Sequence, residues 1–158
     1  MTIDDRKVAK VAKEIEEKTC SPAVAIELED GTMITGKTSD LLGSSAAALL
    51  NAVKKLGKIE DDVKLVSPQA IEPIQTLKTQ YLGSQNPRLH TDEVLIALSG
   101  SAATNPLAEL ALSQLPKLKG CQAHTSVMLS DVDIKTFKKL GVQLTCEAVY
   151  EPSRRFKV

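Results

Sequence analysis

Residues 37–45 are mostly small and polar, with one lysine and one aspartate, a composition that suits anion binding. The candidate ligand contacts in this stretch are Lys37, Thr38, Ser39, Asp40, Ser44 and Ser45. The stretch follows an alternating apolar segment and precedes an Ala/Leu-rich segment, so we expect it at a strand-to-helix junction. Free backbone N–H groups and the helix dipole attract anions at a helix N-terminus. The pattern therefore predicts a small anionic or nucleotide-like ligand in a crevice at the strand ends.

Residues 31–38, GTMITGKT, match the phosphate-loop pattern G-x-x-x-x-G-K-[ST] literally. A phosphate loop must connect a strand to a helix, because its backbone wraps around the phosphate. Here Asp30 and Gly31 are typical of a tight hairpin turn, and the residues after them alternate as in a strand. We therefore interpret the match as a hairpin strand, with Lys37 at its solvent-facing end.

A second set of candidate contacts flanks a helix that we expect over residues 90–104. His90 precedes this helix, and a solvent-exposed loop histidine is the favoured interpretation; the alternative is a general acid or base oriented by Asp92. At the other end, the sequence SGSAATN offers three polar contacts, Ser101, Thr104 and Asn105. The small residues there also allow close helix packing, within the fold or across a dimer, and packing is the favoured interpretation.

Several classes of chemistry lack the residues that they need. Cys121 and His124 are close in sequence, but no second pair stands at ligand spacing, so we expect no metal and no cofactor. Three cysteines at wide spacings favour a reducing cytoplasm over a disulfide framework. Twenty basic residues balance twenty acidic ones and aromatics are 3%, which disfavours nucleic-acid binding. No apolar run has the length of a membrane span, so we expect a cytoplasmic protein without a membrane partner.

Hydrophobic periodicity and turn residues predict an alternation of helices and strands in one domain over residues 1–158. The expected helices cover residues 4–18, 44–56, a segment from Pro73, 90–104, 106–115 and 131–140. The expected strands are 23–30, 32–37, 63–66, 123–129 and 142–146, and residues 147–158 form a surface tail. The last strand–helix–strand run predicts a right-handed unit with parallel strands.

This pattern predicts an α/β fold, a three-layer α/β/α sandwich with a mixed sheet of about five strands. The order of elements is reminiscent of the cytidine-deaminase-like architecture. Zinc deaminases place a His or Cys with a Glu on one helix start and Pro-Cys-x-x-Cys on the next. This chain has GSSAAALLN and SPQAIEP in those places, so a deaminase reaction is disfavoured.

Long segments of the chain also resemble one bacterial family. They are AIELEDGTMITGKTSDLLGSSAAALLNAVKKL, SPQAIEPIQTLK, LGSQNPRLHTDEVLIALSGSAATNPLAELALSQLPKLKGCQAH and KKLGVQLTCE. Over residues 5–147 the sequence resembles the C-terminal domain of the proteins known as domain of unknown function eighteen-forty-six. The resemblance implies longer relatives, whose N-terminal part is a P-loop kinase-like domain and thus a possible partner. This chain would then be an excised domain or a stand-alone relative, and the resemblance implies no particular reaction.

The leading hypothesis is an accessory domain that binds a small anionic or nucleotide-like ligand without a complete catalytic set of its own. One alternative is a structural or oligomerisation module that forms a homo-oligomer through the small-residue helix. The other is a hydrolase or transferase domain that uses His90, Asp92 and a Ser or Thr of the anion-binding stretch.

Overall fold

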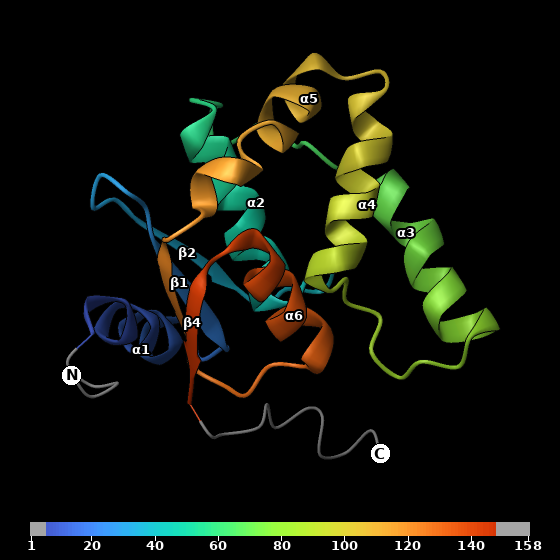
Figure 1. The fold of residues 1–158 in the computed structure, drawn as a ribbon. Coiled ribbons are helices and arrows are strands. Elements are labelled where there is room, and N and C mark those ends of the chain that lie inside the picture. The colour runs from blue at the N-terminus through green and yellow to red at the C-terminus, as the bar shows by residue number, and fades with distance from the viewer. Residues whose placement is uncertain (1–5, 148–158) are drawn as a thin grey trace.

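The computed structural model describes residues 6–147 and has an α/β fold with a mixed, four-stranded sheet (Figure 1). The strands are β1 (Ala23–Glu27), β2 (Met33–Lys37), β3 (Gln122–Thr125) and β4 (Gln143–Cys146), in the order β2-β1-β3-β4. β1 is antiparallel to both of its neighbours, whereas β3 and β4 are parallel. The carboxyl ends of β2, β3 and β4 therefore lie at the same edge of the sheet. The start of the expected helix at residues 4–5 and the tail at 148–158 lie outside the described residues.

Helices cover both faces of this sheet. The α-helices are α1 (Lys7–Thr19), α2 (Ser44–Leu56), α3 (Pro68–Thr76), α4 (Thr91–Ala102), α5 (Pro106–Leu112) and α6 (Asp131–Leu140). A π-helix, η2 (Leu77–Tyr81), continues α3, and a 3-10 helix, η3 (Leu115–Leu118), follows α5. α1 packs against β1, β2 and β3 on one face, while α2 and α6 cover the other, with α4 and α5 packed against α2 (Figure 1).

The hairpin predicted at residues 30–31 is confirmed, because β1 and β2 pair antiparallel around this turn. Gly31 has a φ of +89°, a conformation that side chains with a Cβ rarely adopt. Asp30 Oδ1 accepts a hydrogen bond from the Thr32 backbone N–H at 2.9 Å. The literal phosphate-loop match is thus a turn and a paired strand.

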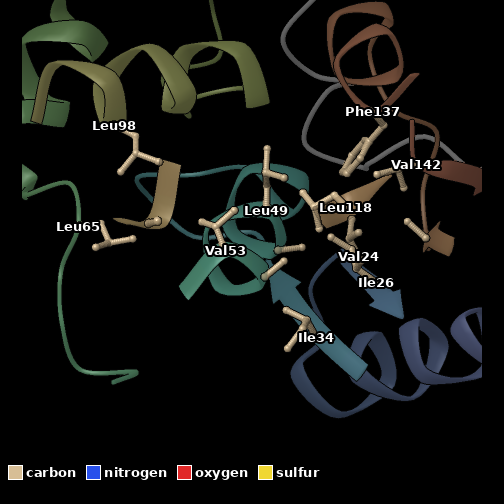
Figure 2. Packing of buried hydrophobic residues seen from close by; sticks show 14 of the residues in the cluster. Val24, Ile26, Ile34, Leu49, Val53, Leu65, Leu98, Leu118, Phe137 and Val142 are labelled. Carbon is tan, nitrogen blue, oxygen red and sulfur yellow. The ribbon is translucent and has the colours of Figure 1, made fainter. Parts of the chain in front are cut away.

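The main core lies between the sheet and the α2 side of the molecule. Alternation along β1 directs Val24 and Ile26 into this core, where they join Leu49 and Val53 of α2 (Figure 2). Ala25, between the two strand residues, points to the other face and packs beneath α1. The predicted apolar stripe of residues 44–56 is therefore the face that packs on the sheet.

The expected five-stranded sheet is wrong by one strand. Residues 63–66 are not a strand: the Val63 N–H bonds to the Glu60 carbonyl in a turn, and Leu65 and Val66 are buried in the main core. A short apolar run can be buried without strand pairing, so its composition alone does not decide between the two. The cytidine-deaminase-like topology stays a prediction.

The helix expected from Pro73 begins five residues earlier. Ser67 caps it, since its Oγ accepts a hydrogen bond from the Ala70 N–H at 3.2 Å, and Pro68 takes the first helical position that suits proline. Pro73 lies inside the helix, where it leaves the carbonyl of the exposed Gln69 without its helical donor. The helix then widens into η2, which carries the buried Lys78.

Candidate functional site

The N-termini of α2, α4 and α6 lie close together (Figure 1). Residues at all three line a cavity of about 40 Å³. We call it the α2–α4–α6 cavity; it is lined by residues 43–45, 88–90 and 127–130 together with Thr38, Asn86 and Asp133. It lies beyond the carboxyl ends of β2 and β3, which flank the oppositely directed β1. Such strand ends are where open α/β sheets commonly bind ligands.

The loop before α2 is tied to the loop before α4. Leu42 and Leu89 form an isolated parallel bridge, in which the Gly43 N–H donates to the Leu89 carbonyl and the Leu89 N–H to the Leu41 carbonyl. Ser39 Oγ accepts hydrogen bonds from the N–H groups of residues 41 and 42, which closes the turn after β2. This pairing places one wall of the cavity on each loop.

The N-terminus of α2 has no side-chain cap. Its N-cap residue is Gly43, which offers no side-chain acceptor, whereas α3, α5 and α6 are capped by Ser67, Asn105 and Ser130. The first N–H groups of a helix have no acceptor within the helix. Ser45, in the same turn, is 2% exposed, and its Oγ has no hydrogen-bond partner among the described residues. Ser45 therefore brings a buried hydroxyl without a partner to the helix turn that forms this wall.

A buried carboxylate joins α6 to α4 on another wall. Asp133 Oδ1 accepts hydrogen bonds from the backbone N–H of Thr91 at 2.9 Å and from its Oγ1 at 2.8 Å. The Asp133 N–H in turn donates to Ser130 Oγ at 3.4 Å, which caps α6. Among residues 6–147, Asp133 is the only acidic residue that lines the cavity.

His90 is held by a carboxylate other than the one expected. Glu93 Oε1 lies 3.1 Å from His90 Nδ1, 2.8 Å from the His90 backbone nitrogen and 2.8 Å from Lys78 Nζ. Asp92 instead accepts from the Glu93 N–H and is exposed. The alternative in which Asp92 orients His90 is therefore wrong, because Glu93, three positions on, reaches back over the N-cap, whereas Asp92, two positions on, does not.

The surroundings of Glu93 keep it charged. Burial alone raises the pKa of this carboxyl, but hydrogen bonds from His90 and Lys78 outweigh burial and lower the pKa to about 2. Lys78 Nζ also donates to the Arg88 carbonyl at 2.5 Å, and Arg88 Nε donates to the Ser39 carbonyl at 2.6 Å. Arg88, a lining residue of the cavity, is thus held by contacts with Lys78 and with the loop before α2.

The comparisons with known proteins identify the family. The sequence profile described as "Domain of unknown function DUF1846, C-terminal" matches residues 4–156. The chain belongs to this family. It is 60% identical over 146 residues to a UPF0371 protein of Corynebacterium urealyticum, covering 92% of this chain and 29% of that protein. It is 47% identical over 154 residues to one of Streptococcus uberis, covering 98% of this chain and 31% of that protein.

These findings confirm the family resemblance inferred from the sequence. The DUF1846 C-terminal domain described here spans about a third of the length of the curated relatives that it matches. The printed names of these relatives state no ligand or reaction. The P-loop domain partner stays a prediction.

The DUF1846 C-terminal domain brings four of the predicted contacts to the cavity, Thr38, Ser44, Ser45 and His90. Three others, Lys37, Ser39 and Asp40, are exposed and do not line it. The last three, Ser101, Thr104 and Asn105, lie at the opposite end of α4, about 15 Å or more from His90 at a rise of about 1.5 Å per residue. Asn105 caps α5 there, accepting from the Leu107 N–H at 3.0 Å.

Two residues that sequence reasoning missed complete the cavity. Arg88 lines one side of it, and Asp133, from the first turn of α6, lines another. A weak signal marked the first: Arg88 is the only arginine between residues 7 and 153, and it immediately precedes the segment that opens α4. No local signal marked Asp133 as facing the same space.

The second histidine belongs to a separate polar cluster beneath α1. His124 is fully buried, with Nδ1 2.7 Å from Thr145 Oγ1 and Nε2 3.2 Å from Glu147 Oε1. Burial lowers its pKa, although Glu147 opposes the shift. Within residues 6–147, no group of three or more His, Cys, Asp or Glu side chains is arranged to hold a metal. No helix in that range is long and apolar enough to cross a membrane.

Proposed function

We propose that the domain binds the anionic group of a small ligand in the α2–α4–α6 cavity. The observation that carries the proposal is Ser45 Oγ, a buried hydroxyl without a partner on a helix turn without a cap. Leaving such a group unsatisfied costs about 1–3 kcal/mol. A bound oxyanion would offset this free-energy cost, because it can accept hydrogen bonds both from the hydroxyl and from the first N–H groups of α2.

The charges around the cavity support an anion. Of the described residues in the lining, Arg88 is the one with a permanently cationic side chain, and its planar guanidinium suits phosphate or carboxylate oxygens. The dipole of α2 adds partial positive charge at the same place. The carboxylate of Asp133 repels an anion, but this repulsion is reduced because one of its oxygens already accepts two hydrogen bonds from Thr91.

The size of the cavity limits what it encloses. A water molecule needs about 10–15 Å³ of such space, so about 40 Å³ suits one polyatomic group rather than a nucleobase. We therefore propose that a phosphoryl-sized group enters the cavity while the rest of any larger ligand stays outside it. The proposal includes binding alone and no reaction.

Titration of the 158-residue chain with orthophosphate, followed by calorimetry and by melting temperature at constant ionic strength, tests this proposal. We expect Arg88→Gln and Ser45→Ala each to weaken binding about tenfold or more, equivalent to about 1.4 kcal/mol. Without phosphate, Ser45→Ala should be at least as stable as the parent, since it removes an unpaired buried hydroxyl.

Lys37→Ala is the matched control, because it removes an exposed cation that does not line the cavity. It should leave phosphate affinity unchanged. The proposal fails if the parent chain binds no phosphate, or if Lys37→Ala weakens binding as much as Arg88→Gln does.

A further inference from the structure

We infer that the α2–α4–α6 cavity selects an oxyanion that carries a proton, and hence phosphate over sulfate, with Asp133 as the residue that selects. The inference rests on the proposed function and adds the class of ligand to it. The N-terminus of α2 alone does not carry this inference. It stands on two side chains with unused hydrogen-bonding capacity at one cavity, the buried Ser45 hydroxyl and the Asp133 carboxylate.

Asp133 keeps one carboxylate oxygen for a ligand. The residue is 7% exposed, and both hydrogen bonds from Thr91 go to Oδ1. None of the hydrogen bonds among the described residues uses Oδ2. A carboxylate can only accept hydrogen bonds, so any group that meets Oδ2 favourably has to bring a hydrogen.

The two walls of the cavity therefore require different hydrogen-bonding groups on one ligand. The wall formed by α2 and Arg88 offers N–H and O–H donors, including Ser45 Oγ, and requires acceptor oxygens. The wall formed by α6 offers an acceptor, Asp133, and requires a donor. Hydrogen phosphate and the monoanion of a phosphate monoester satisfy both walls, because they combine oxygens bearing negative charge with one P–OH group.

Sulfate and simple carboxylates satisfy only the donor wall. They carry no proton near neutral pH, so one of their oxygens would face the Asp133 carboxylate with neither a hydrogen bond nor a screening water. Unpaired like charges in a confined site are an effective way to reject a ligand of otherwise similar shape. The same carboxylate that weakens binding of anions in general thus sets the specificity for protonated ones.

Calorimetric titration of the 158-residue chain with orthophosphate, methyl phosphate and sulfate at about pH 6, where a phosphate monoester keeps part of its proton, tests the inference. We expect orthophosphate to bind at least tenfold more tightly than sulfate. Binding of methyl phosphate as well would assign the ligand to phosphate monoesters, and its exclusion would assign inorganic phosphate.

Asp133→Asn is the decisive variant. The amide oxygen can still accept from Thr91, while the amide nitrogen turns the selective wall into a donor. We expect phosphate affinity to fall, sulfate affinity to rise, and the preference to drop to threefold or less. Asp131→Asn is the matched control, since it removes an exposed acid from the same first turn of α6, and its preference should stay at that of the parent.

Each outcome is decisive. If phosphate and sulfate bind the parent chain alike, the inference is overturned while the proposed function stands; if neither binds, both are overturned. The inference would also be overturned if Asp131→Asn lost the preference for phosphate as fully as Asp133→Asn does. Removal of any negative charge near the cavity would then have the same effect. If Asp133→Asn does not fold, the ratio of affinities in the parent chain still decides.

Discussion

At Gly36 the backbone of β2 approaches the backbone of α2 so closely that no side chain fits between them. A Cβ built on this residue would lie 2.2 Å from the Ala48 nitrogen and 2.6 Å from its Cα. The second glycine of the literal phosphate-loop pattern is therefore required for packing the helix on the sheet. The packing of α2 on β2 thus explains why Gly36 is a glycine, and no phosphate-binding role is needed.

We predict that Gly36→Ala lowers the free energy of unfolding by about 2 kcal/mol or more, because overpacking against backbone atoms forces β2 and α2 apart. Urea denaturation followed by circular dichroism measures this change. Gly100→Ala is the opposite control: a Cβ there meets nothing within 4 Å, and replacing a helical glycine should stabilise α4 by about 0.5–1 kcal/mol. Equal effects of the two substitutions would contradict the packing explanation.

At the level of elements, the start of α4 is held by a lysine side chain of the neighbouring η2. Lys78, 7% exposed on η2, reaches both Glu93 and the carbonyl of Arg88. Short π-helical segments are uncommon and often lie at functional sites. Here η2 supplies a buried ammonium group that donates to the Arg88 carbonyl. It therefore helps to position Arg88, which lines the cavity.

This network predicts a pH-dependent part of the stability. The pKa of Glu93 is lowered from its ordinary 4.5 to about 2 in the folded protein, so its contribution is fully present above about pH 5 and is lost as the pH falls toward 2. Because the carboxylate is partly exposed, we expect a change on the order of 1 kcal/mol. Urea unfolding of the parent chain and Glu93→Gln between pH 7 and 3 measures it.

The stability difference between these two proteins should shrink as the pH is lowered. Glu109→Gln serves as the control, since it removes an exposed carboxylate from the first turn of α5. A difference between the parent and Glu93→Gln that stays constant over the whole pH range would show that the network contributes nothing through ionisation.

For the described molecule as a whole, the two faces of the sheet are unequal. The α2 face holds the large core, whereas the buried apolar residues beneath α1 are few and mostly small, Val8, Ala12 and Ala25. Polar ties compensate in part: Arg6 donates to Thr145 Oγ1, to Gln122 Oε1 and to the Gln143 carbonyl. Hydrogen bonds from Arg6, the N-cap residue of α1, thus add to the apolar contacts that hold this helix on the sheet.

Amide hydrogen exchange should therefore reveal a hierarchy. We expect α1 to open with a smaller free energy than α2, because less apolar surface is exposed when it detaches. Arg6→Ala should speed exchange in α1 about three- to tenfold, as expected for losing hydrogen bonds worth about 1 kcal/mol. Lys10→Ala, on the exposed side of α1, should not change it, and equal protection of α1 and α2 in the parent chain would contradict the prediction.

The sequence alone determined those features that depend on neighbours along the chain. Asp30 and Gly31 specify the turn between β1 and β2, the apolar stripe of residues 44–56 specifies the buried face of α2, and Ser130 specifies the start of α6. Each depends on backbone conformation or on side-chain periodicity within a few residues. The α/β fold class and the parallel pairing of β3 with β4 followed from these elements.

Only the tertiary structure decided which groups share the cavity. Arg88 and Asp133 are 45 positions apart in the chain, and they face one space because Leu42 pairs with Leu89 and Thr91 bonds to Asp133. No local sequence pattern specifies that these two residues lie close together, since this depends on how α4 and the loops before α2 and α4 pack against one another. For the same reason sequence reasoning named Thr38, Ser44 and Ser45, which line the cavity, but missed Arg88 and Asp133; anion binding there stays a prediction.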